Sequence, residues 1–491
     1  MFPGHRVSPC EKRTSYVPWL HLLLTARADR VTIDILPNDV LLYIFHFDRL
    51  EDADYLWHMK WRRLIHVCQM WRSVAFASPK FLELRIVCGP RTRMELIGIW
   101  PPLPIVIGNG EDGSTPEVDD FDGIDAAIVH HNRICKIDLH LTSSKLHRLA
   151  SVMQEQFPTL TYLKLVSDYS VPRALLPDGF LGGYAPRLQS LKFEGIVFPV
   201  PLKFLLSATN LIHLTLWRTY HPGCITPDTL VTILAVLTNL KSLTIGSGPI
   251  LSSIDQESRY SPPSNRTVLP ALIHFELRGA SNYVESFMAQ IDTPLLDSLC
   301  ITFFHPDTFD MPQLAQFMRR TTRFQALNEA HVDFDYGGIH VESLPQIYLF
   351  NEMSGFSISC NDFDWRLSSV ANALTSFFPS IYIVERLYIS GCGHVLSQWQ
   401  DDIDNSMQLL EIFRPFNSVK HLYVNKDLAQ RIAPALQELV VERVTDVLPA
   451  LESLFSEELQ ALGPIRDAIE QFVAARQLLG HPIAISDWND T

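Results

Sequence analysis

The sequence predicts an α/β protein in which a small all-helical unit precedes a solenoid of strand-and-helix repeats. Two patterns predict this fold: helical periodicity over residues 36–75, and an apolar-x-x-apolar-x-apolar motif that returns along residues 134–424. The composition agrees, because 47% of the 491 residues are hydrophobic and 19% are charged. A chain of this length and composition can bury a large core.

The helical unit begins with Pro37 and Asp39, which suit the first turn of a helix. Two groups of apolar residues at helical spacing predict two amphipathic helices: Val40, Leu41, Ile44 and Phe45, then Leu64, Val67, Cys68, Trp71 and Val74. Two short helices cannot bury enough surface to be stable alone. Apolar surface should therefore remain for the rest of the chain or for a partner.

Two motifs of this unit resemble the F-box: LPNDVLLYIF at 36–45 and VCQMWRSVA at 67–75. The link over 48–61 is several residues longer than in a typical F-box. The runs ASPKFLELRIVC at 77–88 and IWPPLPIVI at 99–107 resemble F-box proteins of basidiomycete fungi. The resemblance implies docking to a Skp-type adaptor and, through it, to a cullin. It assigns eight residues to the small core or to the adaptor contact, and the sequence leaves that division open: Leu36, Pro37, Val40, Leu41, Ile44, Phe45, Val67 and Trp71.

Five parts are expected along the chain. They are a poorly ordered leader over 1–30, the F-box over 31–80, a connector with an acidic loop over 81–129, the solenoid over 130–460 and a C-terminal cap over 461–491. The leader contains a short apolar run, 17–26, that also fits a signal peptide. The cap should hold a helix from Pro464, ended by Gly480, and a last strand at 483–485.

The apolar motif recurs at steps of roughly 23 to 35 residues, close to the leucine-rich-repeat range. Its copies are Ile134/Ile137/Leu139, Leu160/Leu163/Leu165, Leu188/Leu191/Phe193, Leu211/Leu214/Leu216, Leu240/Leu243/Ile245, Leu272/Phe275/Leu277, Leu296/Leu299/Ile301, Leu327/Ala330/Val332, Met353/Phe356/Ile358, Val384/Leu387/Ile389 and Val419/Leu422/Val424. The last two apolar positions of each copy are two residues apart, so both should point from a strand into the core. The pattern resembles an irregular, right-handed leucine-rich-repeat solenoid with one strand per repeat and a helical cap. The family's Asn after the third Leu is missing, with Asp168, Thr219 and Gly248 at or near its place.

Residues between the repeat leucines should face away from the core, onto the concave strand face that solenoids use for recognition. Those expected to contact a target protein are Tyr162, Lys164, His213, His274, Glu329, Arg386, Tyr388 and Tyr423. The alternative is that they are merely solvated, and the acidic loop at 111–125 is a competing site that favours a basic segment. The face histidines should not form a metal site, because the strands that carry them are not adjacent.

Several classes of function are not expected. The net charge of −14 argues against nucleic acid, and no apolar stretch is long enough to span a membrane. The eight cysteines form no C-x-x-C pair, which indicates free thiols in a reducing compartment, the cytoplasm or nucleus. GNGEDG at 108–113 spells a nucleotide-loop pattern, but acids follow it and a plain loop is expected.

No motif for catalysis, a cofactor or a metal was found, so a non-enzymatic role is expected. The resemblance implies the substrate-recognition subunit of an SCF (cullin-RING) ubiquitin ligase. The alternative is an F-box scaffold or regulator that acts outside a ubiquitin ligase.

Overall fold

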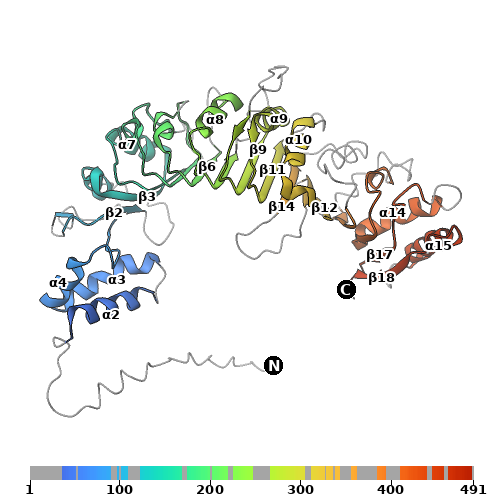
Figure 1. Ribbon diagram of the computed structural model, residues 1–491, viewed down its shortest axis with the longest axis horizontal. Helices are drawn as coiled ribbons and strands as arrows, with labels where there is room; N and C mark the ends of the chain where they lie inside the picture. Colours follow the sequence, from blue (N-terminus) through green and yellow to red (C-terminus); the bar gives the residue numbers. More distant parts are fainter. Residues whose placement is uncertain are drawn as a thin grey trace, which may run out of the picture. The chain divides into compact units, whose positions relative to one another are not determined.

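The computed structural model describes residues 36–50, 54–89, 97–98, 101–108, 122–168, 174–199, 202–218, 225–246, 266–304, 311–326, 328–335, 338–342, 355–361, 384–393, 410–439, 445–457 and 463–488. The chain divides into two compact units, Met1–Arg85 and Ile86–Thr491. We call them the helical unit and the sheet unit (Figure 1). The expected leader over 1–30 lies outside the described residues.

The helical unit contains α2 (Asn38–Leu50), α3 (Asp54–Val67) and α4 (Gln69–Ala77) among its described residues. The sequence predicted two helices, with one of them continuous through Cys68. That prediction was wrong, because Cys68 is extended (φ −157°, ψ 172°) and its Sγ accepts a hydrogen bond from Trp71 N at 3.4 Å. Cys68 therefore caps the start of α4, and α3 occupies the long link.

The sheet unit is a mixed α/β structure around a sheet whose described part has 16 strands. Its order is β1-β2-β3-β4-β5-β6-β7-β9-β11-β14-β13-β12-β15-β16-β17-β18. The strands are β1 (Ile86–Cys88), β2 (Ile105–Gly108), β3 (Ile134–Leu141), β4 (Tyr162–Ser167), β5 (Ser190–Glu194), β6 (His213–Trp217), β7 (Ser242–Gly246), β9 (His274–Gly279), β11 (Ser298–Phe304), β12 (Glu329–Asp335), β13 (Gly338–Glu342), β14 (Gly355–Asn361), β15 (Arg386–Gly391), β16 (His421–Val424), β17 (Ser453–Ser456) and β18 (Ala484–Asp487). A separate pair joins β8 (Thr267–Val268) to β10 (Ile291–Asp292).

The repeat leucines form continuous buried rows. Leu163, Leu191, Leu214 and Leu243 are paired in register across parallel strands, and each is at most 1% exposed. This prediction from the repeat pattern is confirmed. The outward residues between the leucines alternate with them and remain partly exposed, as the period of a strand requires.

The sheet begins earlier in the chain than the expected solenoid start at residue 130. β1 pairs with β2, and β2 with β3, so residues assigned to a connector form the first two strands of the same sheet. Ile86 and Ile105 are fully buried there. The acidic stretch between β2 and α6 (Asp122–Ile128), residues 109–121, lies outside the described residues.

The prediction of one strand per repeat, with the strands in chain order, was wrong in the middle of the sheet. β12 folds back on β13 and β13 on β14, both antiparallel. β14 then pairs in parallel with β11, while β12 pairs in parallel with β15. The chain therefore passes over two strand positions, returns through them, and resumes its parallel course at β15.

The Asn that the leucine-rich-repeat pattern places after the third leucine is missing here. Polar side chains just before the first leucine of a repeat make hydrogen bonds to the backbone instead. Asn239 Nδ2 donates to Thr209 O at 3.0 Å, and Asn210 Nδ2 donates to Pro186 O at 2.8 Å. Thr159 Oγ1 donates to Ile134 O at 2.8 Å in the same way. Each of these side chains hydrogen-bonds the backbone of the preceding repeat. These bonds stabilise the turns that lead into the strands.

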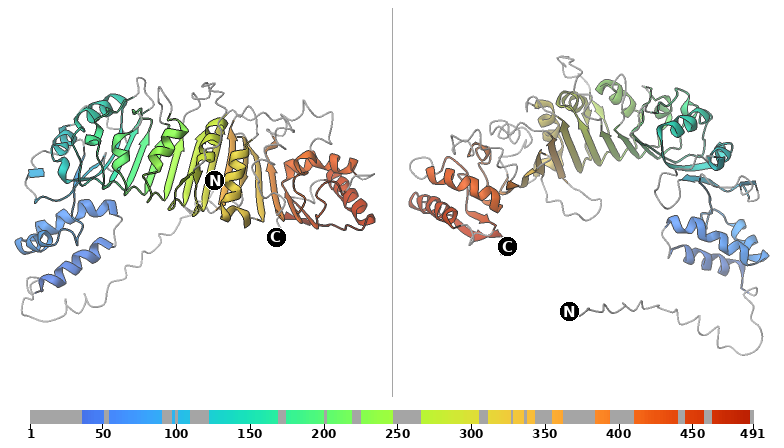
Figure 2. Two further views of the ribbon diagram at one scale, coloured as in Figure 1. Left: turned by 45° about the horizontal axis from the view of Figure 1, so that its top comes forward. Right: turned by 180° about the vertical axis from the view of Figure 1, so that it is seen from behind.

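The described helices of the sheet unit cover the convex face of the sheet, and the strands line the concave face (Figures 1 and 2). They are α6, α7 (Ser143–Val152), α8 (Pro227–Leu234), α9 (Ser281–Gln290), α10 (Pro312–Arg320), α14 (Lys426–Glu438) and α15 (Pro464–Leu478).

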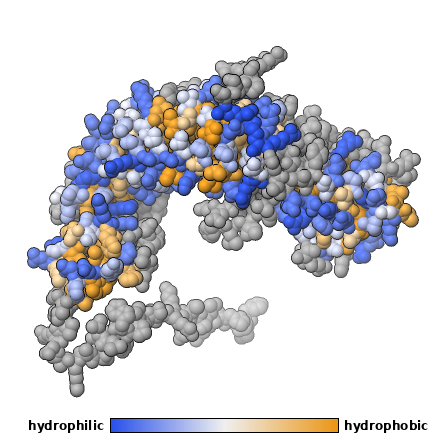
Figure 3. Space-filling model, viewed as in Figure 1, coloured by the Kyte–Doolittle hydropathy of each residue, from blue (hydrophilic) through white to orange (hydrophobic). Residues whose placement is uncertain are grey.

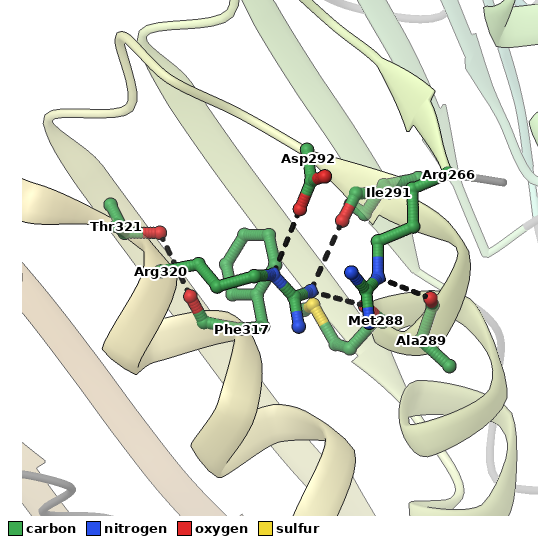
Figure 4. Close-up of polar contacts among 8 residues, drawn as sticks. All are labelled: Arg266, Met288, Ala289, Ile291, Asp292, Phe317, Arg320 and Thr321. Atoms are coloured by element: carbon green, nitrogen blue, oxygen red, sulfur yellow. Dashed lines mark hydrogen bonds and ion pairs between the residues drawn. The ribbon is translucent and has the colours of Figure 1, made fainter. Parts of the chain in front are cut away.

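Two arginines hold the carboxyl end of α9 (Figure 4). Arg320 Nε donates to Asp292 Oδ1 at 2.8 Å, and its Nη2 reaches Met288 O and Ile291 O, both at 3.4 Å. Arg266 Nε donates to Ala289 O at 3.1 Å. These guanidinium groups satisfy carbonyls that have no partner within the helix.

The C-terminal segment follows the predicted cap closely. α15 starts at Pro464, Gly480 adopts φ +85° just beyond its end, and β18 pairs in parallel with β17. Arg476 of α15 is 0% exposed and donates to the carbonyls of Val447, Leu448 and Pro449 at 3.1–3.3 Å. The buried guanidinium fixes the cap helix on the turn that precedes β17.

Candidate interaction surfaces

The helical unit has a small aromatic core. Leu41, Phe45, Trp61 and Ile65 are each at most 1% exposed, and the Phe45 ring lies 4.8 Å from that of Trp71. Trp61 Nε1 donates to Arg85 O at 3.1 Å. Trp61 was missed in the sequence because it lies in the link, where no helix was predicted.

The same unit exposes apolar side chains along one face of α2. Val40, Tyr43 and Phe47 are 43%, 59% and 64% exposed, and they recur at steps of three and four residues. Val67, at the end of α3, is 57% exposed. Apolar residues gather over this unit on the side seen in Figure 3. Grouped exposed apolar residues of this kind mark interaction sites.

The structure divides the eight residues that the motif left unassigned. Leu41 and Phe45 are core residues, while Pro37, Val40 and Val67 are exposed. The three remaining residues are half-buried: Leu36, Ile44 and Trp71.

All eight residues predicted to contact a target lie on strands and face away from the core, with partial or full exposure. They are Tyr162 and Lys164 on β4, His213 on β6, His274 on β9, Glu329 on β12, Arg386 and Tyr388 on β15, and Tyr423 on β16. The structure brings Glu329, Arg386, Tyr388 and Tyr423 together on adjacent strands, whereas the other four lie on β4, β6 and β9, away from this group. His213 and His274 both pair with Ser242 of the strand between them, so they lie on non-adjacent strands as expected.

Charges on the first half of the face pair with one another. Lys164 Nζ lies 3.0 Å from Asp138 Oδ1, and Lys136 Nζ lies 4.5 Å from the centre of the Tyr162 ring. Burial acts to lower the pKa of Lys164, but the hydrogen bond and charge of Asp138 outweigh it and raise that pKa. Farther along, Arg278 lies 3.1 Å from Glu276 and 4.4 Å from the Trp217 ring.

The second half of the face carries four aromatic rings in register, which we call the aromatic ladder: His331, Tyr388, Tyr423 and Phe455. Successive ring centres are 4.2, 4.1 and 4.4 Å apart, with planes inclined by 4°, 10° and 8°. Adjacent strands lie about 4.8 Å apart, so in-register rings reach stacking distance without distorting the backbone. The ladder therefore follows from the strand pairing.

Glu329 lies beside the ladder and contacts both the His331 ring of the ladder and the guanidinium of Arg386. Its carboxylate lies 2.9 Å from His331 Nε2 and 2.9 Å from Arg386 Nη2. Burial lowers the pKa of His331 although a hydrogen bond to the Glu329 carboxylate acts to raise it. Burial, the charge of Glu329 and a hydrogen bond with Tyr423 raise the pKa of Tyr388 to about 12. At neutral pH the ladder is thus uncharged, with a carboxylate and a guanidinium at its margin.

Phe455 and Trp488 were missed in the sequence. Phe455 lies in a strand whose third apolar position is Ser456, so the repeat motif is incomplete there. Trp488 follows β18, and its ring centre is 6.0 Å from that of Tyr388 and 5.8 Å from that of Tyr423. The short apolar run at 483–485 was the only signal for a strand that brings this tryptophan to the face.

Other candidate sites are less developed in the described part of the chain. Of the acidic loop at 111–125, only residues 122–125 are described, and Asp125 of α6 pairs with Arg148 of α7. No group of three or more potential metal ligands occurs among the described residues. A search of those residues also found no helix long and apolar enough to cross a membrane.

No protein-family model matches the chain, and no curated protein sequence matches it. Among solved structures, it is similar to the crystal structure of the leucine-rich repeat-containing protein LegL7 from Legionella pneumophila. The TM-score is 0.23 and the sequence identity 12%, with 72% of this chain and 91% of that chain covered. The α/β architecture with a large parallel sheet is established by the strand pairing described above.

Proposed function

We propose that this chain is a non-enzymatic substrate receptor of an SCF (cullin-RING) ubiquitin ligase. In this proposal the helical unit is an F-box that docks a Skp-type adaptor, and the sheet unit is an irregular leucine-rich-repeat solenoid that holds a target protein. The observation that carries it is the division of the motif residues: Leu41 and Phe45 form a core, while Val40 and Val67 remain exposed. A unit of three short helices keeps such apolar surface where a partner helix covers it.

The proposed role is mechanical. A receptor that binds adaptor and target together raises the effective concentration of the target near the ubiquitin-loaded enzyme. No side chain of this chain needs to make or break a bond in such a role, and the cullin is reached only through the adaptor.

The proposed compartment is the cytoplasm or nucleus. Cys68 and Cys392 are free thiols among the described residues, which suits a reducing environment.

The test is adaptor binding by the full-length chain. A purified Skp-type adaptor should bind the wild-type protein, and Val40→Asp or Val67→Asp should weaken binding at least roughly tenfold, because each buries a charge in an apolar contact. Val268→Asp is the matched control, since Val268 is 53% exposed on β8 and lies in the sheet unit.

Two outcomes decide between the alternatives. Wild-type protein that is folded but does not bind the adaptor refutes the proposal. Adaptor binding without co-purification of a cullin favours the scaffold or regulator that acts outside a ligase.

A further inference from the structure

The aromatic ladder is a property of one half of the face only. At the position between the two buried leucines, β4 to β7 carry Lys164, Lys192, Thr215 and Thr244. The equivalent positions of β12, β15, β16 and β17 carry His331, Tyr388, Tyr423 and Phe455. The fold is built equally well with either set, because both face away from the core. Burial of the repeat leucines therefore does not require aromatic rings at these positions, and the rings form an apolar surface on the outward face.

A side chain of the same protein already occupies the ladder. Trp488 follows the last strand of the sheet, yet its ring contacts Tyr423 on β16 and Tyr388 on β15, beyond the neighbouring strand β17. To reach both, the indole must lie across the sheet face. The indole plane is inclined by 48° to the Tyr388 ring and by 58° to the Tyr423 ring, and the ring centres are 6.0 and 5.8 Å apart. Inclined rings at these distances are a favourable aromatic arrangement.

We propose that the aromatic ladder is the binding site for an aromatic side chain, tryptophan foremost, of a target protein segment, and that Trp488 occupies this site until the target displaces it. The inference rests on the proposed function in that the strand face holds the target. It adds the class of residue that is recognised and a competition within the chain that tunes recognition.

The chemistry of the site fits an aromatic residue of a polypeptide. The stacked rings offer apolar and π surface, and Arg386, whose side chain is 44% exposed, lies at the margin with its partner Glu329. Arginine and tyrosine are the residues that most often dominate protein interfaces. Because Trp488 is tethered to the site by its own strand, its effective concentration is high, and a target must compete with it.

The test measures binding of a defined probe to the full-length protein. The probe is a fluorescein-labelled peptide, AISDWNDT, with the sequence of residues 484–491. The control peptide, AISDANDT, has alanine in place of the tryptophan. Fluorescence anisotropy is recorded with wild-type protein and with the Trp488→Ala variant. Two ring contacts of ordinary strength predict that the variant binds the tryptophan peptide roughly 5- to 100-fold more tightly than the wild type does.

Matched variants separate the site from general effects. Trp217→Ala removes another tryptophan of the same face, far from the ladder along the sheet, and should bind the peptide as the wild type does. In the Trp488→Ala background, Tyr423→Leu should abolish the gain, whereas Tyr423→Phe should retain it because the ring remains. A chain that ends at Asp487 removes the indole by another route and should behave like Trp488→Ala.

Each outcome has a defined meaning. Equal affinity of wild type and both indole-lacking variants for the tryptophan peptide overturns the self-occupancy. Equal affinity of the two peptides for Trp488→Ala overturns the ladder as an aromatic site. Adaptor binding is measured on the same preparations, so a negative peptide result with intact adaptor binding refutes this inference alone. If the wild-type protein does not bind the adaptor, the ligase proposal is refuted, but the peptide result remains valid.

Discussion

Truncation of Leu214 to alanine should destabilise the sheet unit strongly. Leu214 is 1% exposed and is paired in register with Leu191 and Leu243, which are 1% and 0% exposed. Alanine lacks three of the leucine side-chain carbons, and at about 0.8 kcal/mol per buried methylene the lost transfer free energy is about 2.4 kcal/mol. The cavity left between fixed neighbouring strands adds to this, so the free energy of unfolding should fall by about 3–5 kcal/mol.

The assay is urea unfolding of the full-length chain, followed by circular dichroism. Because repeats unfold locally, amide hydrogen exchange over residues 190–246 gives the second readout, and protection should fall first in β5, β6 and β7. Leu295→Ala is the control, since Leu295 is 62% exposed and its truncation should change the free energy of unfolding by less than about 0.5 kcal/mol. Equal losses in the two variants would refute the argument that the row of leucines is a continuous core.

Two further predictions concern buried polar groups of the sheet unit. Arg476→Met should lower the free energy of unfolding by roughly 2–5 kcal/mol in urea titrations, because the carbonyls of Val447, Leu448 and Pro449 lose a charged donor. His331 has a pKa below the ordinary 6.5 and is neutral when folded, whereas the unfolded chain takes up a proton near 6.5. Wild-type stability should therefore fall as the pH drops below 6.5 toward the folded-state pKa, and His331→Gln should reduce that loss between pH 7.5 and 5.5.

Matched variants check both predictions. Arg466→Met removes a guanidinium that is 49% exposed and paired with Glu470, so it should have little effect. An equal effect of Arg466→Met and Arg476→Met would contradict the role given to burial. His481→Gln replaces an exposed histidine and is the control for the loss of an imidazole as such. If His331→Gln leaves the pH dependence unchanged, the burial of the neutral imidazole is not what sets the slope.

The repeat leucines were predictable because their spacing is a direct consequence of strand geometry. Leu163 and Leu165 are two residues apart and both point into the core, which any strand of either direction enforces. For the same reason, strand order was not predictable. Ala330/Val332 and Phe356/Ile358 show the same alternation as the parallel repeats, although β12 and β14 join through an antiparallel strand.

The candidate site on the strand face was only half predictable. Arg386, Tyr388 and Tyr423 lie in clear repeats, so their outward direction followed from the pattern. Their contact with Glu329 and His331 depends on β12 lying beside β15, which the pattern does not encode. In the helical unit, the motif identified the apolar residues, but the division into core and surface needed the break at Cys68 and the placement of Trp61.

The passage through β13 has a consequence for folding during synthesis. Up to β11, each new strand of the main sheet can pair with one that has already emerged. β12 emerges next, but β11 has to wait for β14, which ends at Asn361. At about 5–20 residues per second, synthesis from Glu329 to Asn361 takes roughly 2–7 seconds. During that interval β11 presents an unpaired edge backed by a formed core, so misassembly with other chains is expected on the ribosome more than after release.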